Sequence, residues 1–480
     1  MDASTGGVPL SLVVSDDGLF AAHISGKDLV VHSKPTAEHK DMQAGRIKET
    51  TVKSLKFCPS RTAKNNRHLL ITNESHISVW QLEPLQIVAE IENVEPGTLN
   101  VEFGGDENEV LVFHAWNNKM AIHSIDNGRT SVIKTPKFPH PLGFGYRPKT
   151  KQHLAIILKP EASDILTIHE LPSYELLDRT VLPTIDAQGL KWSLDGKWIA
   201  VWDTASSGTK VLILTADGQI FRTYDGPAGV DDSFDLGVKQ IEWSPAAGPS
   251  GVSETLAVGK VNGNIDLLRT RTFSSSTTLS HVFPTDLVSP ADQSPLSIWR
   301  ERSTSAMGDA EYAEATSSSA INMSPEASGP PRGVAIMTFS PDGTLLATVD
   351  TMRSNAVWIW ALDVTPRLAS ILVHENAVRQ VIWHPSTPQL LINTITNNLP
   401  IVRWWSPQSH PVIARVPTQK SESGKYEVKW LVDEEHDSAF WFGSSEEYVV
   451  GYLSADESSV QFEVLNFFAN RGPPTGSISR

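Results

Sequence analysis

The chain has 480 residues, with 40 Lys and Arg against 55 Asp and Glu, so its formal net charge is −15 at pH 7. Because a nucleic-acid coat neutralises phosphates with a basic face, this balance argues against direct binding of nucleic acid. Hydrophobic residues make up 40% of the chain and charged residues 20%, which supplies a buried core and excludes a globally disordered chain.

The single cysteine, Cys58, excludes an intramolecular disulfide and a cysteine zinc cluster, and it fits a reducing compartment. No apolar run reaches the roughly 18 residues that a membrane-spanning helix needs. The first residues lack the basic and apolar regions of a secretory signal. We therefore expect a soluble intracellular protein that does not bind membranes.

One short pattern recurs along the chain: an apolar-alternating segment, mostly ending on an aromatic residue, runs into a polar turn. Its copies span residues 12–18, 55–59, 101–105, 144–148, 190–196, 241–245, 337–343, 381–385 and 428–430. The spacing is roughly 45 residues, the period of a four-stranded propeller blade. One gap, between Trp243 and Phe339, is about twice as long.

Each copy has a physical interpretation as the first strand of a blade. The alternation places the aromatic residue and its second neighbour on one face of a strand. In the copy that ends with Ser340-Pro341-Asp342-Gly343, Pro fixes φ, Asp bonds back to the backbone and Gly takes the left-handed conformation. Further strands are predicted at residues 343–348 and 356–360, and no long helical periodicity occurs.

Nine such signals predict an all-β fold, a WD-repeat β-propeller of about nine degenerate four-stranded blades. Seven blades plus an appended pair, or two smaller rings, would give the same signals. The Trp-Asp pair expected at the end of the third strand is mostly missing, and no Gly-His dipeptide occurs. Aromatic packing is therefore expected to hold the blades together more than the buried hydrogen-bonded network of the consensus repeat.

The same pattern divides the chain into four parts. Propeller blades are predicted over residues 1–273 and 333–465, a Ser/Pro-rich and mostly disordered insertion over 274–332, and a flexible tail over 466–480. The insertion is rich in Ser, Thr, Pro and Ala, so it buries too little apolar surface to offset the entropy of ordering.

The insertion also holds the candidate interaction and modification residues. Ser289, Ser294 and Ser324 each precede a proline, which makes them minimal proline-directed phosphorylation sites or chance occurrences in a Ser/Pro-rich loop. The hydrophobic island 296–300 contains Trp299 and Arg300. It is expected either to dock back onto the propeller or to anchor a partner, because Trp and Arg dominate interface hot spots.

No pattern in the chain indicates catalysis. There is no phosphate-binding loop, nucleophile elbow or His-Glu-x-x-His helix. Trp358, Trp360, Trp404 and Trp405 have strand spacing, which favours core packing over an aromatic ligand box. We expect no enzyme activity, no cofactor and no metal.

Several stretches resemble a known family. Residues 189–218 and 241–259, and above all 339–348, 355–360 and 405–407, are similar to the Wdr-eight (WRAP-type) family of centrosome and spindle-pole-body WD-repeat proteins, and to its fungal members in particular. The pair Trp202-Asp203 and the run Asn355-Ala356-Val357-Trp358 belong to this match. The resemblance covers residues 185–410, and the first 180 residues match by blade pattern only.

The resemblance implies a non-enzymatic scaffold at the microtubule-organising centre, the spindle pole body in fungi. In that family a coiled-coil microtubule-anchoring protein and, in some fungi, a kinesin-14 motor act with the scaffold to tether spindle microtubule minus ends. Because an acidic body is repelled by the acidic microtubule lattice, this chain is expected to reach microtubules only through those partners.

Two other classes of function fit the sequence less well than a scaffold does. A translation-initiation-factor-like propeller binding ribosomal partners would be expected to carry long Lys-rich extensions, and the residues after Val464 contain only two Arg. A propeller hydrolase would need a separate catalytic domain, for which the predicted blades leave no room.

Overall fold

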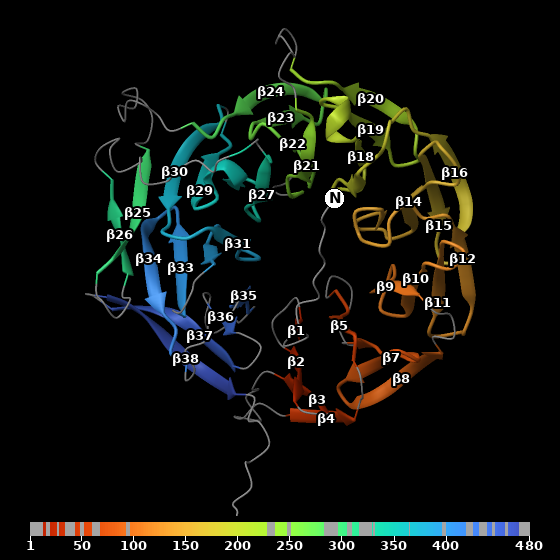
Figure 1. Cartoon of the computed structure of the whole chain (residues 1–480), viewed down its shortest axis with the longest axis horizontal. Coiled ribbons are helices and arrows are strands. Elements are labelled where there is room, and N and C mark those ends of the chain that lie inside the picture. The colour runs from red at the N-terminus through yellow and green to blue at the C-terminus, as the bar shows by residue number, and fades with distance from the viewer. Residues whose placement is uncertain are drawn as a thin grey trace, which may run out of the picture. The chain divides into compact units, whose positions relative to one another are not determined.

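The computed structural model is all-β in the part of the chain that it describes. That part comprises residues 13–15, 20–25, 28–33, 44–48, 52–59, 68–92, 97–227, 236–246, 251–282, 296–304, 310–315, 329, 332–363, 365–395, 400–418, 426–431, 439–443, 447–456 and 459–469. Its strands form nine sheets, eight of four strands and one of six (Figure 1). These are the blades of a β-propeller, so the predicted fold class and the count of about nine blades are confirmed.

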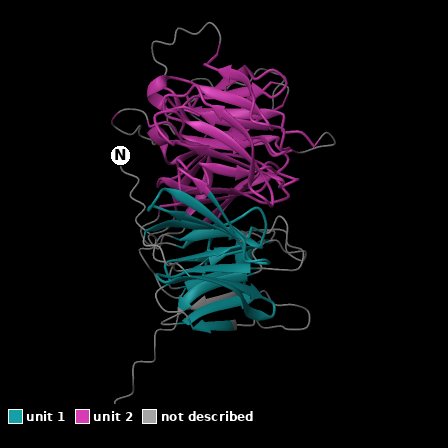
Figure 2. Ribbon diagram, turned by 90° about the vertical axis from the view of Figure 1, so that its right-hand side faces the viewer, with its two compact units in different colours: residues 1–132, 396–401, 414–480 teal, residues 133–395, 402–413 magenta. Residues whose placement is uncertain are grey.

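The blades fall into two compact units, drawn in teal and magenta in Figure 2. Unit 1 spans residues 1–132, 396–401 and 414–480, and unit 2 spans residues 133–395 and 402–413. Every blade is one contiguous piece of chain with its four strands in sequence order. Each predicted segment, from 12–18 to 428–430, overlaps the first strand of a blade.

Unit 1 holds blades 1, 2, 3 and 9. Their strands are β1 (Val13–Val14), β2 (Phe20–Ser25), β3 (Asp28–Ser33) and β4 (Ala44–Lys48) in blade 1; β5 (Ser54–Phe57), β6 (His68–Thr72), β7 (His76–Leu82) and β8 (Leu85–Glu92) in blade 2; β9 (Thr98–Phe103), β10 (Glu109–His114), β11 (Lys119–Ser124) and β12 (Thr130–Lys134) in blade 3; and β35 (Glu427–Trp430), β36 (Ala439–Gly443), β37 (Glu447–Asp456) and β38 (Ser459–Ala469) in blade 9.

Within unit 1, blade 9 packs directly against blade 1. Ala21 of blade 1 shares a buried cluster with Leu431, Trp441 and other residues of blade 9. The ammonium of Lys429 donates a hydrogen bond of 2.7 Å to the carbonyl oxygen of Val14. In the described chain no strand crosses from one blade to the other. Contacts made by side chains, including the hydrogen bond from Lys429, join the two blades.

Unit 2 holds blades 4 to 8. Their strands are β13 (Phe144–Tyr146), β14 (His153–Leu158), β15 (Ile165–Glu170) and β16 (Glu175–Val181) in blade 4; β17 (Gly189–Trp192), β18 (Trp198–Trp202), β19 (Val211–Thr215) and β20 (Ile220–Tyr224) in blade 5; β21 (Val238–Trp243), β22 (Thr255–Lys260), β23 (Ile265–Arg269) and β24 (Ser274–Leu279) in blade 6; β27 (Val334–Phe339), β28 (Leu345–Asp350), β29 (Ala356–Ala361) and β30 (Arg367–Val373) in blade 7; and β31 (Val378–Trp383), β32 (Leu390–Thr394), β33 (Ile401–Ser406) and β34 (Ser409–Arg415) in blade 8. The 3₁₀ helices η1 (Ala205–Ser207) and η4 (Thr351–Arg353) lie between strands of blades 5 and 7.

The core lies between neighbouring blades, where middle strands of one sheet face those of the next. Trp202 and Ile213 of blade 5 pack with Val258 and Leu268 of blade 6, all at most 3% exposed. The fourth strands of blades 4 to 6, β16, β20 and β24, are exposed to solvent instead and run along the outer side of unit 2 in Figure 1. The alternation of apolar and polar residues in the sequence therefore indicates which face of each strand packs against a neighbouring blade.

The aromatic residue of the first strand also makes a recurring hydrogen bond in unit 2. The indole N–H of Trp192 donates to the carbonyl of Gly145 in the preceding blade at 2.8 Å. Trp243 and Trp383 repeat this contact with Lys191 and Thr338, at 3.1 and 3.0 Å. Each of these tryptophans thus links its blade to the one before it, in addition to filling the core.

The turn after the first strand has the predicted chemistry. The Ser340 hydroxyl donates to the Asp342 carboxylate at 2.5 Å and accepts from the backbone N–H of Leu345 at 2.9 Å. Gly343 has a φ of 72°, the left-handed conformation that favours glycine. Ser193, Asp195 and Gly196 form the same turn in blade 5.

Blade 7 retains part of the buried hydrogen-bonded network, which the sequence predicts to contribute less than aromatic packing. His281 Nε2 lies 2.8 Å from the hydroxyl of Thr348, and that hydroxyl accepts from the Trp360 indole at 3.0 Å. His281 follows serine rather than glycine, so a search for Gly-His does not find it. Buried hydrogen bonds therefore hold this blade together in addition to aromatic packing.

The described part of the segment 274–332, expected as an insertion, contains three strands. Ser274–Leu279 is β24, the fourth strand of blade 6, and β25 (Ser297–Ser303) and β26 (Ala310–Glu314) form a hairpin. Ser and Thr serve in β24 because this outer strand faces solvent on alternate residues, so its composition resembles that of a loop. At the other boundary, β38 continues to Ala469, beyond residue 465.

Candidate interaction surface

The hairpin β25–β26 covers the outer edge of blade 7. Strand β25 pairs in parallel with β30, from Ser297 opposite Ser370 to Arg300 opposite Val373. The sheet of blade 7 thereby grows to six strands in the order β26-β25-β30-β29-β28-β27. As a result, the last four residues of β30 are buried, whereas the outer strands of the other blades of unit 2 are largely exposed.

Trp299 points its side chain into the protein. Its indole is only 9% exposed, packs in a cluster with Trp383 and Trp405 of blade 8, and lies 4.8 Å from the His410 ring. Arg300 is half-buried on the same strand. The island 296–300 therefore docks back onto the propeller, and a partner-binding role for Trp299 and Arg300 stays a prediction. Ser289, Ser294 and Ser324 lie outside the described residues.

A buried polar cluster fixes this hairpin to blades 7 and 8. Arg403 of β33 donates from Nη2 and Nε to the two carboxylate oxygens of Glu301 in β25, at 2.6 and 2.9 Å. His374, at the end of β30, places Nδ1 3.4 Å from the same carboxylate and 3.2 Å from the hydroxyl of Tyr312. Arg403 is fully buried and Glu301 is 3% exposed.

The electrostatics of this cluster keep one fixed ion pair. Burial raises the pKa of Glu301, but hydrogen bonds from His374 and Arg403 outweigh it and bring that pKa to about 2. Burial lowers the pKa of His374 and raises that of Tyr312 well above its ordinary value of 10.0. At neutral pH Glu301 and Arg403 are charged while His374 and Tyr312 are neutral, so the cluster is suited to holding strands together rather than to transferring protons.

A second buried carboxylate organises the loop between blades 4 and 5. Asp203, 1% exposed, accepts backbone N–H bonds of 2.8 Å from Ile185, Asp186 and Thr204. Asp164, also 1% exposed, accepts from Lys137 in the same region. Asp203, which the sequence marked only as half of a Trp-Asp pair, is therefore a structural anchor.

The largest apolar exposure in unit 2 lies on the outer strand of blade 4. In β16, Leu176 is 54%, Leu177 50% and Val181 60% exposed. On the next blade, Ile220 and Phe221 of β20 are 40% and 53% exposed. Edge strands with this composition are prone to pair with other chains, so natural proteins usually blunt them with charge or cover them.

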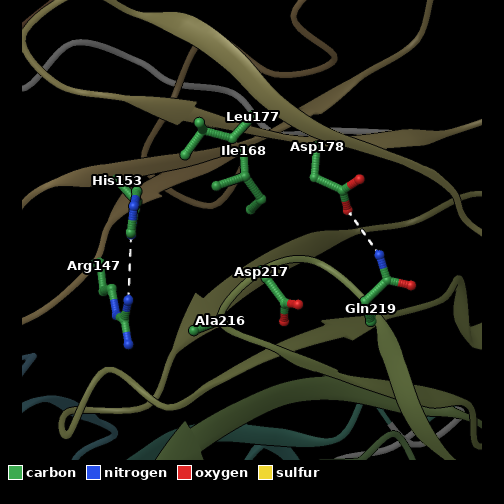
Figure 3. A pocket seen from close by; sticks show the side chains of 8 residues that line it. All are labelled: Arg147, His153, Ile168, Leu177, Asp178, Ala216, Asp217 and Gln219. Atoms are coloured by element: carbon green, nitrogen blue, oxygen red, sulfur yellow. Dashed lines mark hydrogen bonds between the residues drawn. The ribbon is translucent and has the colours of Figure 1, made fainter.

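Beside β16 lies a cleft of about 500 Å³ between blades 4 and 5 (Figure 3). Its walls combine an apolar part, an acidic part and a basic part. Its lining residues are Arg147, His153, Ile168, Leu177, Asp178, Ala216, Asp217 and Gln219. In Figure 3 Leu177 and Ile168 lie together, Asp178 and Gln219 face one another at the other end, and Asp217 lies between Ala216 and Gln219.

The charge of the cleft is acidic at one end. Gln219 Nε2 donates to Asp178 Oδ2 at 3.3 Å. Arg147 donates from Nε to the carbonyl of Gly196 at 2.8 Å, which holds its guanidinium against the protein. Burial, with a smaller effect of Arg147, lowers the pKa of His153, so this imidazole is neutral at pH 7. The cleft thus has two carboxylates against one guanidinium, which favours a cationic group at its acidic end.

In the part of the chain that the structure describes, no group of three or more His, Cys, Asp or Glu side chains could hold a metal ion. Likewise, the described chain contains no helix long and apolar enough to cross a membrane.

Two known WD-repeat proteins match this chain, over 69% and 74% of its length. No protein-family model matches the chain. The mouse (Mus musculus) WD repeat-containing protein WRAP73 is 26% identical over 350 residues, which cover 69% of this chain and 71% of that protein. Over most of its length this chain is therefore similar to a WRAP-type WD-repeat protein. An uncharacterised WD repeat-containing protein of Schizosaccharomyces pombe is 24% identical over 372 residues, 74% of this chain and 72% of that protein.

Solved structures share the fold of this chain. The crystal structure of a eukaryotic initiation factor superposes with a TM-score of 0.55 over 84% of this chain and 86% of that one, at 12% identity. Identity this low shows a common propeller architecture and carries no function from one protein to the other.

Sequence reasoning missed the exposed edge of β16 and the ion pair that holds the hairpin. The signal for β16 was present, since Leu176, Leu177 and Val181 fall in the fourth-strand position of a blade, where polar residues are expected. No comparable signal marked Glu301 and Arg403, because they lie 102 residues apart.

Proposed function

We propose that this WRAP-type chain is a non-enzymatic scaffold at the microtubule-organising centre, the spindle pole body in fungi, where it helps to tether spindle microtubule minus ends. The observation that carries this proposal is the match to WRAP73 over 69% of the chain, together with the family resemblance of residues 185–410. Its partners would be a coiled-coil microtubule-anchoring protein and a kinesin-14 motor.

The use of ionisable groups supports a scaffold rather than an enzyme. Four deeply buried ones, Glu301, Arg403, Asp203 and Asp164, are engaged in contacts that hold strands and loops. The exposed features are apolar outer strands and the open cleft beside β16, which suit protein contacts.

The net charge of −15 supports indirect attachment to microtubules. The microtubule surface is itself acidic, so long-range repulsion opposes direct binding. Purified chain should therefore remain in the supernatant when microtubules are sedimented at physiological salt, and it should enter the pellet only when a partner protein is added.

Imaging of a fluorescent fusion through mitosis tests the proposal. We expect discrete foci at both spindle ends that persist when microtubules are depolymerised. A diffuse signal, or a signal that follows ribosomes, would remove the proposal. Substitution of Trp116, which is 66% exposed on blade 3, by Phe serves as a matched control that should leave the foci unchanged.

A further inference from the structure

Blade 7 shows how the outer edge of a blade in this protein accepts an additional strand. Strand β25 pairs with β30 through four consecutive residue pairs and places Ile298 in one interblade cluster and Trp299 in the next. An extended segment from outside the blade thus gains backbone pairing and apolar burial at the same time. This combination is the basis of peptide recognition by strand addition.

The equivalent edge of blade 4 is open. In the described chain, β16 ends its sheet and pairs only with β15. It exposes Leu176, Leu177 and Val181, whereas β24 of blade 6 presents Ser and Thr on its exposed residues. The seven residues of β16 are long enough to pair as extensively as β30 does with β25.

We propose that the outer edge of β16 binds an extended segment of a partner protein, which adds a fifth strand to blade 4 and carries apolar side chains flanked by a Lys or Arg. This inference rests on the proposed scaffold function and specifies the class of partner segment at this surface. The apolar side chains of the segment pack on Leu177 and Val181, and its cation lies toward Asp178 and Asp217.

The acidic end of the cleft favours a Lys or Arg in the partner segment. Neighbouring strands of a sheet place side chains of one row on the same face, so a residue paired near Asp178 projects beside that carboxylate and the acidic end of the cleft in Figure 3. In Figure 3 Arg147 and His153 lie across the cleft from Asp178. The imidazole of His153 is also neutral, so this end keeps its acidic charge. The charge of −15 attracts a basic segment and opposes pairing with a second copy of the chain.

The test is a selection from a random twelve-residue peptide library on the full-length chain, followed by fluorescence anisotropy with the synthetic peptides obtained. We expect peptides with apolar residues next to Lys or Arg. Leu177→Arg and Asp217→Lys should each weaken their binding roughly tenfold or more. Val88→Arg, a similarly exposed apolar residue on the outer strand β8, should leave binding unchanged.

Backbone pairing is tested with two N-methylated versions of one selected peptide, methylated at alternate amides. Only one of the two sets of amides points toward β16 in an added strand, so one version should lose binding and the other should retain it. Equal effects of both versions, peptides without a basic residue, binding insensitive to Leu177→Arg, or no selected peptide would each overturn the proposal. A dimer that Leu177→Arg dissociates would also overturn it, in favour of a second copy.

The outcome is separable from that of the proposed function. Spindle-end foci of the wild-type fusion together with unaltered peptide binding in Leu177→Arg would reject the β16 site and leave the scaffold function standing. Diffuse wild-type signal together with loss of peptide binding in Leu177→Arg would reject the location and keep the binding edge. Matching circular dichroism spectra and melting temperatures of the variants and wild type confirm that all are folded.

Discussion

The guanidinium of Arg403 donates two hydrogen bonds, of 2.6 and 2.9 Å, to the carboxylate of Glu301, although 102 residues separate them along the chain. Arg403 belongs to a blade strand and Glu301 to a hairpin from the interblade insertion. The pair therefore converts part of an insertion into a fixed element of the propeller.

Removal of one member of this pair should be costly. Arg403→Met leaves the carboxylate of Glu301 buried without its main partner, and such changes destabilise proteins by roughly 3–5 kcal/mol. Urea denaturation followed by tryptophan fluorescence measures the loss. The double variant Glu301→Leu/Arg403→Met should recover most of it, and Arg300→Met on the same strand should change stability by less than about 0.5 kcal/mol. A cost of Arg403→Met no larger than that of Arg300→Met would contradict this account.

Acidification should protonate the carboxylate of Glu301 and remove its contribution to stability. Glu301 has a pKa of about 2 in the folded protein against an ordinary value of 4.5, so the unfolded chain takes up its proton first as pH falls. The stability that Glu301 contributes is complete above about pH 4.5 and is lost progressively toward pH 2. Between pH 6 and pH 3 wild type should lose about 2 kcal/mol more than Glu301→Gln. Parallel stability curves for the two proteins would refute the assignment.

His281 should give a separate pH dependence nearer neutrality. Burial lowers its pKa to about 4 from an ordinary 6.5, against the opposing hydrogen bond to Gly263. Between these values the unfolded chain binds the proton and the folded protein does not, so stability falls as pH drops below about 6.5. At pH 5 this amounts to about 2 kcal/mol. His281→Gln should flatten the thermal stability profile between pH 7 and 5, and an unchanged slope would exclude His281 as its source.

The indole contacts between blades can be tested one at a time. Trp192→Phe removes the hydrogen bond to Gly145 and some buried volume, which together should cost about 1–3 kcal/mol. Phe339 occupies the corresponding position of blade 7, so phenylalanine is compatible with the fold. Thermal denaturation should show the loss in Trp192→Phe and none in Trp116→Phe. Equal melting temperatures would mean that the indole N–H contributes nothing.

The anchoring role of Asp203 predicts a local effect. Asp203→Ala leaves three backbone N–H groups without their acceptor, and we expect a loss of about 3 kcal/mol. Amide hydrogen exchange of Ile185 and Asp186 should accelerate at least as much as that of residues in the blades. Asp217→Ala, at an exposed turn of blade 5, is the control; protection of Ile185 unaltered by Asp203→Ala would argue against the anchor.

The blades could be predicted from the sequence because their signals are local. The first strand of a blade alternates and ends on a core residue such as Trp243, and the turn that follows needs the Ser-Pro-Asp-Gly chemistry seen at Gly343. The hairpin was not predictable in the same way. Its pairing with β30 depends on Glu301 meeting Arg403, a contact that arises only after both blades have formed.

Composition was a poor guide at the outer strands. Ser274–Leu279 looks like a loop because a solvent-facing strand needs few apolar residues, and β24 is nonetheless paired with β23. Conversely, β16 has the apolar residues of a buried strand and lies at an open edge. Both strands lie at the outer edge of a blade, where side chains need not be buried. The sequence of β16 can therefore carry residues that bind a partner.

The packing of blade 9 on blade 1 has a consequence for synthesis of the chain on the ribosome. The nascent N-terminal blade emerges with Ala21 and its neighbours uncovered, and their partners Leu431 and Trp441 follow about 400 residues later. At translation speeds of roughly 5–20 residues per second, that surface waits for tens of seconds. A chaperone that shields the first blade until translation ends would therefore protect the growing chain from aggregation.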